Sequence, residues 1–444
     1  MTATTGSEQR DPLREFLAAK AALDAAPAPT PQRAAAWQRL CAAAAALGMH
    51  EAAYMLAAAA AAEPAGGAPP DGRMSALAAL AAPLPRGGPP PPLPDHLERY
   101  RARYWRDAGL PPGRRRVFAA SDMHVDKAGA RHMEWVQGVG AGPFQNDVLI
   151  VAGDVADTPA GVRATLAALR PKFGRLVYVP GNHELWLGPC GGGGAGGGGG
   201  SARGAADSFA RLMELRQLCA DLDVDTAPIL AAPGLVVAPL LSWYDAAFDR
   251  DDPRPGQLRF DRFCSWPTAD TDVWQVMLRL NTPYLQPPPP PAGGAAPPTH
   301  AAAAAASLAC AAPSSAAAAP GGAVISTSHF LPHPGLPSSP YVRELRKAVG
   351  CAGLLRQLAA VGAAAHVYGH THINGAARLA DPPAAAGGGG GARLYVQYAL
   401  EAAFEGLPRT ARGAGGLPGL ACVFDGWRVV EGLALADIET GVVS

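Results

Sequence analysis

The sequence has 444 residues, and its 37 Lys and Arg residues balance its 37 Asp and Glu residues, so the formal net charge is zero. A neutral chain has no global attraction to nucleic acid or to an anionic membrane, and neither is expected as a partner. Many of the 53 Gly and 45 Pro residues lie in runs, which cannot bury enough apolar surface to fold compactly.

The seven Cys residues are scattered and form no CxxC pair. That distribution is typical of free thiols in a reducing compartment and not of a disulfide framework. No apolar run is long enough to span a membrane, and the N-terminus lacks the apolar core of a signal peptide. We therefore expect an intracellular protein, in the cytoplasm by the simplest interpretation, with an organelle also open. No feature indicates the oligomeric state.

The chain is predicted to have three parts. Residues 1–63 form an Ala-rich helical segment, since Asp11-Pro12 resembles a helix start and the following apolar residues have helical spacing. Residues 64–94 form a Pro- and Gly-rich linker. Residues 95–444 form the main domain, which begins with a short helix. Low-complexity insertions interrupt this domain at 191–200, 287–320 and 382–391, and each is expected on a surface loop.

The main domain shows an alternation of strands and helices. VFAAS (117–121), DVLIVAG (147–153) and RLVYVPG (175–181) are apolar runs of strand length, and a helical pattern lies between the second and third. This order predicts parallel strands, whose carboxyl ends commonly hold the ligand. Asp425-Gly426 joins two apolar runs near the C-terminus and predicts an antiparallel hairpin. The fold class is therefore α/β with mixed sheets.

Five strand ends carry carboxylate, carboxamide or imidazole groups. The blocks are DMH (122–124), GDVAD (153–157), GNHE (181–184), SH (328–329) and GHTH (369–372). Two divalent ions about 3.5–4 Å apart need a bridging carboxylate, which Asp154 can supply. The remaining predicted ligands are Asp122, His124 and His372 for one ion, and Asn182, His329 and His370 for the other. The glycines at 153, 181 and 369 suit tight turns or a close approach of the backbone to the ions.

These ordered blocks resemble the signature of the calcineurin-like metallophosphoesterase superfamily over roughly residues 115–430. The resemblance implies two mixed β-sheets packed as a sandwich flanked by helices, with the N-terminal helical segment as an appendage. It implies that Asp154 belongs to both metal sites, that His183 protonates the leaving oxygen, and that Asp157 orients His183. It also implies two divalent or mixed-valence metal ions, and a ligand set without Cys leaves manganese, iron and zinc possible. LLSWYDAAFDRDDP (240–253), FCSWP (263–267) and SHFLP (328–332) resemble a plant and algal group within the superfamily.

The predicted function is metal-dependent hydrolysis of a phosphate ester, with a metal-activated water as nucleophile and His183 as general acid. A nucleotide phosphodiesterase or a protein serine/threonine phosphatase would use the same ligands. A non-catalytic interaction module on the same fold is the remaining alternative. Monoester or diester preference and the natural substrate stay open.

Further polar and aromatic residues of the domain have structural and functional interpretations. His333 and Asp245 are expected on exposed loops, where they could also touch substrate. His366 lies within a strand pattern and is expected to be structural. Trp186 and Trp243 could line a pocket or belong to the core.

Overall fold

The computed structural model describes most of the chain from residue 95 onward. The described residues are 95–443 except 112–114, 128–129, 188–204, 206, 250, 252–259, 267, 292–295, 312–321, 339–342, 381–391 and 407–416, together with 18, 19, 21, 22, 25, 32, 35, 36 and 39. Those nine N-terminal residues are helical, whereas the predicted linker at 64–94 and the insertions at 191–200 and 382–391 lie outside the described residues. The chain divides into two compact units, Met1–Arg99 and Tyr100–Ser444. The three-part domain division stays a prediction.

The first β-sheet contains the three strands predicted from the βαβ pattern. Its strand order is β11-β10-β1-β2-β3. The strands are β1 (Val117–Ala120), β2 (Val148–Ala152), β3 (Arg175–Val179), β10 (Leu420–Phe424) and β11 (Val429–Ala436). β1, β2 and β3 run parallel, whereas β10 pairs antiparallel with β1 and with β11. The hairpin predicted at Asp425-Gly426 is therefore confirmed, and this sheet is mixed.

The second sheet has the strand order β4-β5-β6-β7-β9-β8. Its strands are β4 (Ile229–Ala232), β5 (Leu235–Pro239), β6 (Ala323–Thr327), β7 (Ala365–Tyr368), β8 (Gly375–Ala380) and β9 (Ala392–Gln397). β5, β6, β7 and β9 are parallel, and the two edge strands are antiparallel to their neighbours. The second sheet is therefore mixed as well.

The two sheets pack face to face around one apolar core. Alternate residues of β1, β2 and β3 point into this core, as Val117 and Ala119 do on β1 and Val148 and Ile150 do on β2. Side chains of β5, β6, β7 and β9 meet them from the other side. The predicted sandwich is confirmed, and the carboxyl ends of the parallel strands of both sheets lie at one edge of it.

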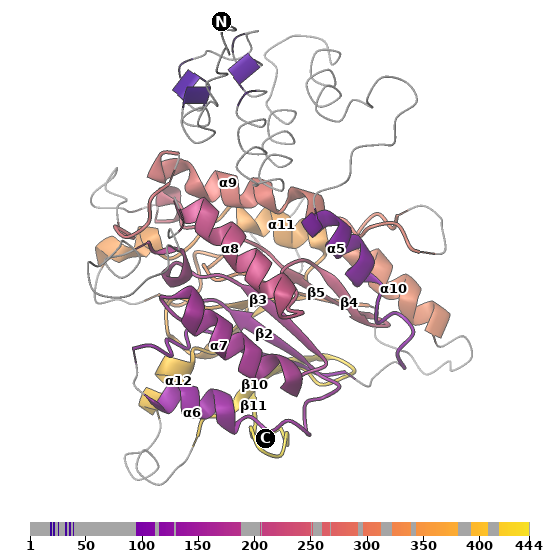
Figure 1. Cartoon of the computed structure of the whole chain (residues 1–444). Helices are drawn as coiled ribbons and strands as arrows, with labels where there is room; N and C mark the ends of the chain where they lie inside the picture. Colours follow the sequence, from indigo (N-terminus) through magenta and orange to yellow (C-terminus); the bar gives the residue numbers. More distant parts are fainter. Residues whose placement is uncertain are drawn as a thin grey trace, which may run out of the picture. The chain divides into compact units, whose positions relative to one another are not determined.

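Helices lie outside the two sheets (Figure 1). They are α5 (Asp95–Tyr104), α6 (Ala130–Gly138), α7 (Pro159–Leu169), α8 (Ser208–Asp221), α9 (Val273–Leu280), α10 (His300–Ala311), α11 (Leu354–Val361) and α12 (Leu400–Gly406). Helix α7 is the predicted crossover between β2 and β3, and Thr158 caps its first turn by accepting from the Gly161 N–H. Within the described residues, no helix has the length and apolar character needed to cross a membrane.

Helix α10 differs from the prediction of a surface loop over residues 287–320. Ala has the highest helix propensity, so the Ala-rich half of this insertion forms a helix that contacts β5 and β6. Ala303 and Ala304 are fully buried. The imidazole of His300 anchors the helix start, because its two ring nitrogens contact the Tyr104 hydroxyl and the Tyr284 carbonyl, each at 2.8 Å. Composition alone was therefore a poor guide to this segment.

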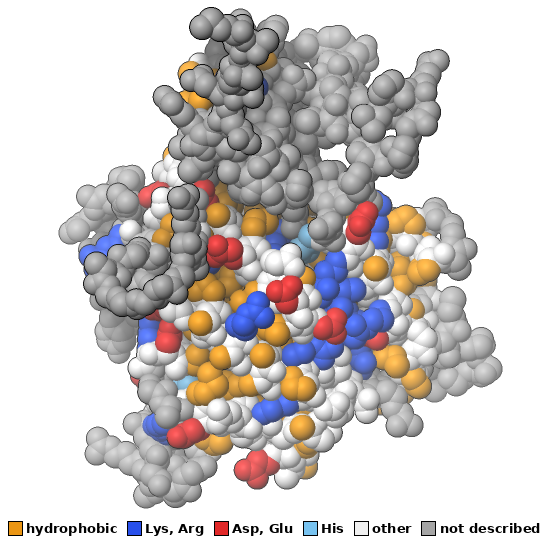
Figure 2. Space-filling model, viewed as in Figure 1, with side chains coloured by type: hydrophobic (Ala, Val, Ile, Leu, Met, Phe, Trp, Pro, Cys, Tyr) orange, Lys and Arg blue, Asp and Glu red, His pale blue; other side chains and the backbone are white. Residues whose placement is uncertain are grey.

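Charged and apolar side chains are interspersed on the face shown in Figure 2. Several of the basic residues share an acidic partner. Arg103, Arg106 and Arg170 all contact the carboxylate of Asp223. One carboxylate therefore offsets part of the positive charge of these three arginines.

Candidate metal centre and active site

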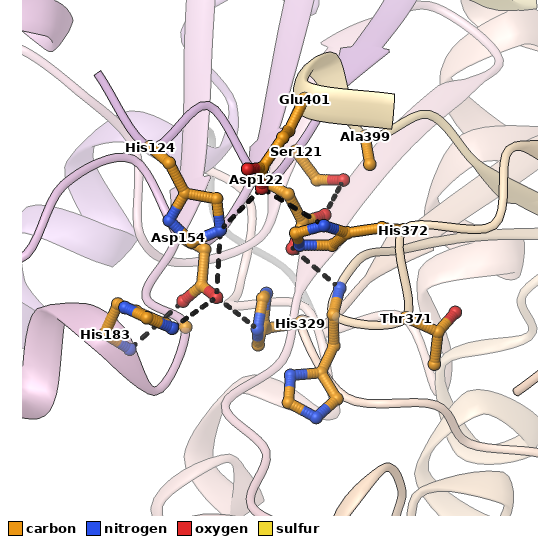
Figure 3. A network of polar contacts seen from close by, with 12 residues as sticks. Ser121, Asp122, His124, Asp154, His183, His329, Thr371, His372, Ala399 and Glu401 are labelled. Atoms are coloured by element: carbon orange, nitrogen blue, oxygen red, sulfur yellow. Dashed lines mark hydrogen bonds and ion pairs between the residues drawn. The ribbon is translucent and has the colours of Figure 1, made fainter. Parts of the chain in front are cut away.

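The predicted site residues come from five strand ends that meet at one edge of the sandwich. Asp122 and His124 follow β1, Asp154 follows β2, and Asn182 and His183 follow β3. From the second sheet, His329 follows β6, and His370 and His372 follow β7. Figure 3 shows several of these side chains converging around Asp122 and Asp154. The meeting of both sheets therefore brings together residues that are far apart in the sequence.

The backbone at these positions is strained. Among the described residues, the non-glycine residues with positive φ are Asp122 (49°), His124 (38°), Asp154 (53°), Asp223 (60°), His370 (77°) and His372 (55°). All of them except Asp223 are predicted metal ligands. A left-handed conformation is unfavourable for residues with a Cβ and concentrates at functional sites. The left-handed backbone therefore occurs at positions whose side chains turn toward a common centre.

Glycines allow the loops to approach one another. A Cβ on Gly369 would lie 2.8 Å from Asp122 Oδ2, and one on Gly181 would collide with Asp154 Oδ1. Gly153 has a φ of +83°, and a Cβ there would lie 2.5 Å from His329 Nδ1. The close approach that the sequence pattern suggested is present at all three glycines.

The first ligand group contains Asp122, His124 and His372, whose ligand atoms lie within 4.8 Å of one another. His372 Nε2 is 3.2 Å from Asp122 Oδ1. The other ring nitrogen of His372, Nδ1, is 3.2 Å from Glu401 Oε2. Glu401 Oε2 is also 3.8 Å from His124 Nε2. One face of this group is therefore closed by a carboxylate from helix α12.

The second ligand group contains Asp154, His329 and His370. The His329 Nδ1–H donates to the Ala152 carbonyl at 2.9 Å, which directs Nε2 toward Asp154 Oδ2 at 3.4 Å. His370 Nε2 contacts the Ala348 carbonyl at 3.1 Å, so its Nδ1 is the nitrogen left to bind a metal. Asn182 joins this group, since its Oδ1 lies 3.2 Å from His329 Nε2.

The oxygen and nitrogen atoms of the second group are suited to bind a cation. Asn182 Oδ1 and Asp154 Oδ2 are acceptors, and both face His329 Nε2. Burial lowers the pKa of His329, but the Asp154 carboxylate outweighs burial and raises it to about 10. A carboxylate oxygen and an amide oxygen beside an imidazole nitrogen are ligand types that divalent metal ions accept. The separations also suit shared ligands, because atoms bonded to one ion at about 2.1 Å lie about 3.0–3.4 Å apart.

Asp154 lies between the two groups. Its Oδ1 accepts the backbone N–H of His183 at 3.1 Å. Its Oδ2 faces imidazole nitrogens of His124 at 3.8 Å, His183 at 3.7 Å and His329 at 3.4 Å. His124 belongs to the first group and His329 to the second. This carboxylate is therefore within reach of both.

His183 lies at the rim of the site and presents Nε2 toward Asp154. Its Nδ1 is 2.8 Å from Asp157 Oδ1 and 2.6 Å from Lys127 Nζ. These partners exclude one another, because Nδ1 donates to Asp157 only when protonated and accepts from Lys127 only when it is not. Burial lowers the pKa of His183, but Asp154 and Asp157 outweigh burial and raise it. His183 also lies close to His124 and Asp157 in a third group with metal-binding geometry.

Several residues at the site were not predicted from the sequence. Glu401 follows strand β9 within a few residues, so the rule that found the other ligands could have found it. Glu184, within the GNHE block, is buried and accepts the backbone N–H groups of Asp154, Val155 and Gly181. It thereby clamps the loops after β2 and β3 together. Lys127 and Asp261 carried no recognisable signal.

Three other residues considered from the sequence, His366, Asp245 and His333, have partners outside the two ligand groups. His366 is buried between the hydroxyls of Ser326 (2.8 Å) and Ser328 (3.0 Å), which confirms a structural role. Asp245 is buried and accepts the N–H of Ala247, and His333 contacts the Ala380 carbonyl. Both therefore have structural partners.

The two tryptophans have different surroundings. Trp243 is buried among Tyr244, Trp266 and Phe330 in the core. The indole of Trp186 lies against the imidazole of His183 in a tilted arrangement, with ring centroids 3.7 Å apart. Of the two, Trp186 therefore belongs to the site.

Comparison with known proteins shows a similarity to one family of phosphoesterases. Residues 115–256 match the family model of the calcineurin-like phosphoesterases. The chain is 54% identical over 70 residues to an acyl-carrier-protein phosphodiesterase, PptH, of Mycobacterium tuberculosis. That match covers 16% of this chain and only 21% of the relative. The crystal structure of the phosphopantetheinyl hydrolase PptH from Mycobacterium tuberculosis aligns with 67% of this chain and 94% of its own, at 20% identity and a TM-score of 0.38. Residues 115–256 are therefore similar to the calcineurin-like phosphoesterases, and the chain spans about a fifth of the length of the curated relative that it matches.

Proposed function

We propose that the protein hydrolyses its phosphate ester with two metal ions. Asp122, His124 and His372 would hold one ion with Asp154, and Asn182, His329 and His370 would hold the other, again with Asp154. The observation that carries this proposal is the convergence of Asn182 Oδ1 and Asp154 Oδ2 on His329 Nε2. Manganese, iron and zinc all suit a set of carboxylate, carboxamide and imidazole ligands that lacks Cys.

Two such ions supply charge neutralisation for the phosphoryl group and a water with a lowered pKa. The protein residues supply the proton for the leaving oxygen. His183 donates it from Nε2, the ring nitrogen that faces Asp154. Asp157 holds the Nδ1–H of the imidazolium and so fixes the ring. Asp122 and Asp154 are fully buried or nearly so, and their negative charge favours binding of the cations.

The phosphodiester of an acyl carrier protein is the first diester to test as substrate. This candidate rests on the name of the relative that is 54% identical over 70 residues. A nucleotide phosphodiesterase and a protein serine/threonine phosphatase are the alternative enzymes on the same ligands. A non-catalytic module would have no use for the general acid, and the contact between His183 and Asp157 supports an enzyme.

A substrate screen tests the proposal. Purified protein loaded with manganese, iron or zinc is offered aryl phosphate monoesters, aryl phosphodiesters, cyclic nucleotides, a phosphopeptide and phosphopantetheinylated acyl carrier protein. We expect metal-dependent release of product from at least one diester, abolished by Asp154→Ala. A folded, metal-loaded protein that is inactive toward the whole panel would contradict the proposal.

A further inference from the structure

Asp261 lies in an irregular segment and contacts two residues of the site through one oxygen atom. Its Oδ1 accepts the side-chain N–H of Asn182 at 2.8 Å and the indole N–H of Trp186 at 2.8 Å. The hydroxyl of Tyr244 lies 3.4 Å from its backbone nitrogen. Neither Asn182 nor Trp186 is near Asp261 in the sequence, and no described strand or helix contains Asp261.

The first contact determines which end of the Asn182 amide faces the metal group. A carboxylate can only accept hydrogen bonds, so it must face the Nδ2 amino group. The Oδ1 atom of Asn182 is consequently turned toward His329 Nε2, at 3.2 Å. Without Asp261, either end of the amide could face His329, and the NH₂ group cannot bind a metal.

The second contact holds the indole ring of Trp186, which lies against His183, the proposed general acid. The indole of Trp186 lies against the imidazole of His183, with ring centroids 3.7 Å apart and an interplanar angle of 40°. Because the indole N–H donates to Asp261, the orientation of the ring that contacts His183 is fixed as well. Lys127 Nζ also lies over the indole, 5.1 Å from the ring centroid.

We propose that Asp261 is a positioning residue that orients the metal ligand Asn182 and, through Trp186, the imidazole of His183. This inference rests on the proposed function. Substituting a residue that hydrogen-bonds to a metal ligand typically lowers metal affinity about 10–100-fold. Asp261 would therefore act on metal binding and on proton transfer without touching the substrate.

The test measures Mn²⁺ affinity by isothermal titration, with folding checked by circular dichroism. Asp261→Ala should weaken the affinity about 10–100-fold, whereas Asp261→Asn, which keeps an oxygen acceptor, should stay near the wild type. Trp186→Phe removes the indole N–H but keeps an aromatic ring, and it should leave the affinity unchanged. Equal affinity in Asp261→Ala and the wild type would overturn the inference, as would a loss in Trp186→Phe as large as in Asp261→Ala.

If Asp261→Ala fails to fold, the inference can be tested by exchanging the amide and the carboxylate between positions 182 and 261. Asn182→Asp places two carboxylates at hydrogen-bonding distance, and adding Asp261→Asn restores one N–H···O bond with the opposite polarity. The second substitution should therefore raise Mn²⁺ affinity about tenfold in the Asn182→Asp protein, while having little effect in the wild type. The same effect in both backgrounds would overturn the inference. If the wild-type protein itself binds no Mn²⁺, it is the proposed function that fails.

Discussion

Replacing His183 separates proton transfer from metal binding. His183→Asn removes the proposed general acid, and we expect both metal ions to remain because the predicted ligands are other residues. General acid catalysis is worth about 10²–10⁴-fold, or about 2.7–5.5 kcal/mol of transition-state stabilisation. Turnover should fall by that amount for esters with basic leaving groups. Acidic phenols leave without a proton, so their hydrolysis should slow much less.

The contact between His183 and Asp157 determines how much the Asp157→Asn substitution should slow turnover. A hydrogen bond to a charged group is worth about 1.5–3 kcal/mol, and Asp157 is about one-third exposed, so water screens part of that value. Asp157→Asn should therefore slow turnover only about tenfold, at the low end of that range.

The assay is the dependence of kcat/KM on leaving-group pKa in a series of aryl phosphate esters, with metal content measured by mass spectrometry. A steeper dependence in His183→Asn, at unchanged metal content, is the predicted result. Loss of metal from this variant would place His183 among the ligands. Equal slowing of good and poor leaving groups would refute its role as an acid.

Two further substitutions and one deletion test the framework of the site. Gly181→Ala should abolish metal binding because its Cβ collides with Asp154 Oδ1, and a metal-loaded Gly181→Ala protein would show that the loops can separate. Asp225→Ala should lower the free energy of unfolding by about 1.5–3 kcal/mol, because the buried guanidinium of Arg175 loses its contact with Asp225 Oδ2 at 2.8 Å and keeps the one with Asp107 Oδ2 at 2.5 Å. Urea denaturation measures this loss, and a change below about 1 kcal/mol would speak against it. Deleting residues 1–94 should leave hydrolysis of small esters intact, and a folded, metal-loaded but inactive truncation would show that this segment completes the site.

The strand ends were predictable from the sequence because each combines two local signals. An apolar run such as DVLIVAG predicts a strand, and the polar residue after it lies where ligands bind in parallel sheets. Asp154 and His370 were predicted as metal ligands in this way. The left-handed backbone of these residues was not predictable, since it depends on how the two sheets meet.

Residues that act through tertiary contacts gave no such signal. Asp261 reaches Asn182 across 79 positions of the sequence and lies in no regular element. Lys127 meets His183 only because the loops after β1 and β3 are neighbours. The helix α10 was missed for a different reason, because an Ala run has little complexity but strong helix propensity.

The central claim is that one carboxylate, Asp154, serves two metal ions. Metal stoichiometry in Asp154→Ala tests it most directly, because other ligand variants leave one complete group. Equilibrium dialysis against Mn²⁺ followed by mass spectrometry should find two ions per chain in the wild type and a loss of both in folded Asp154→Ala. Two ions retained per chain in Asp154→Ala would contradict the account.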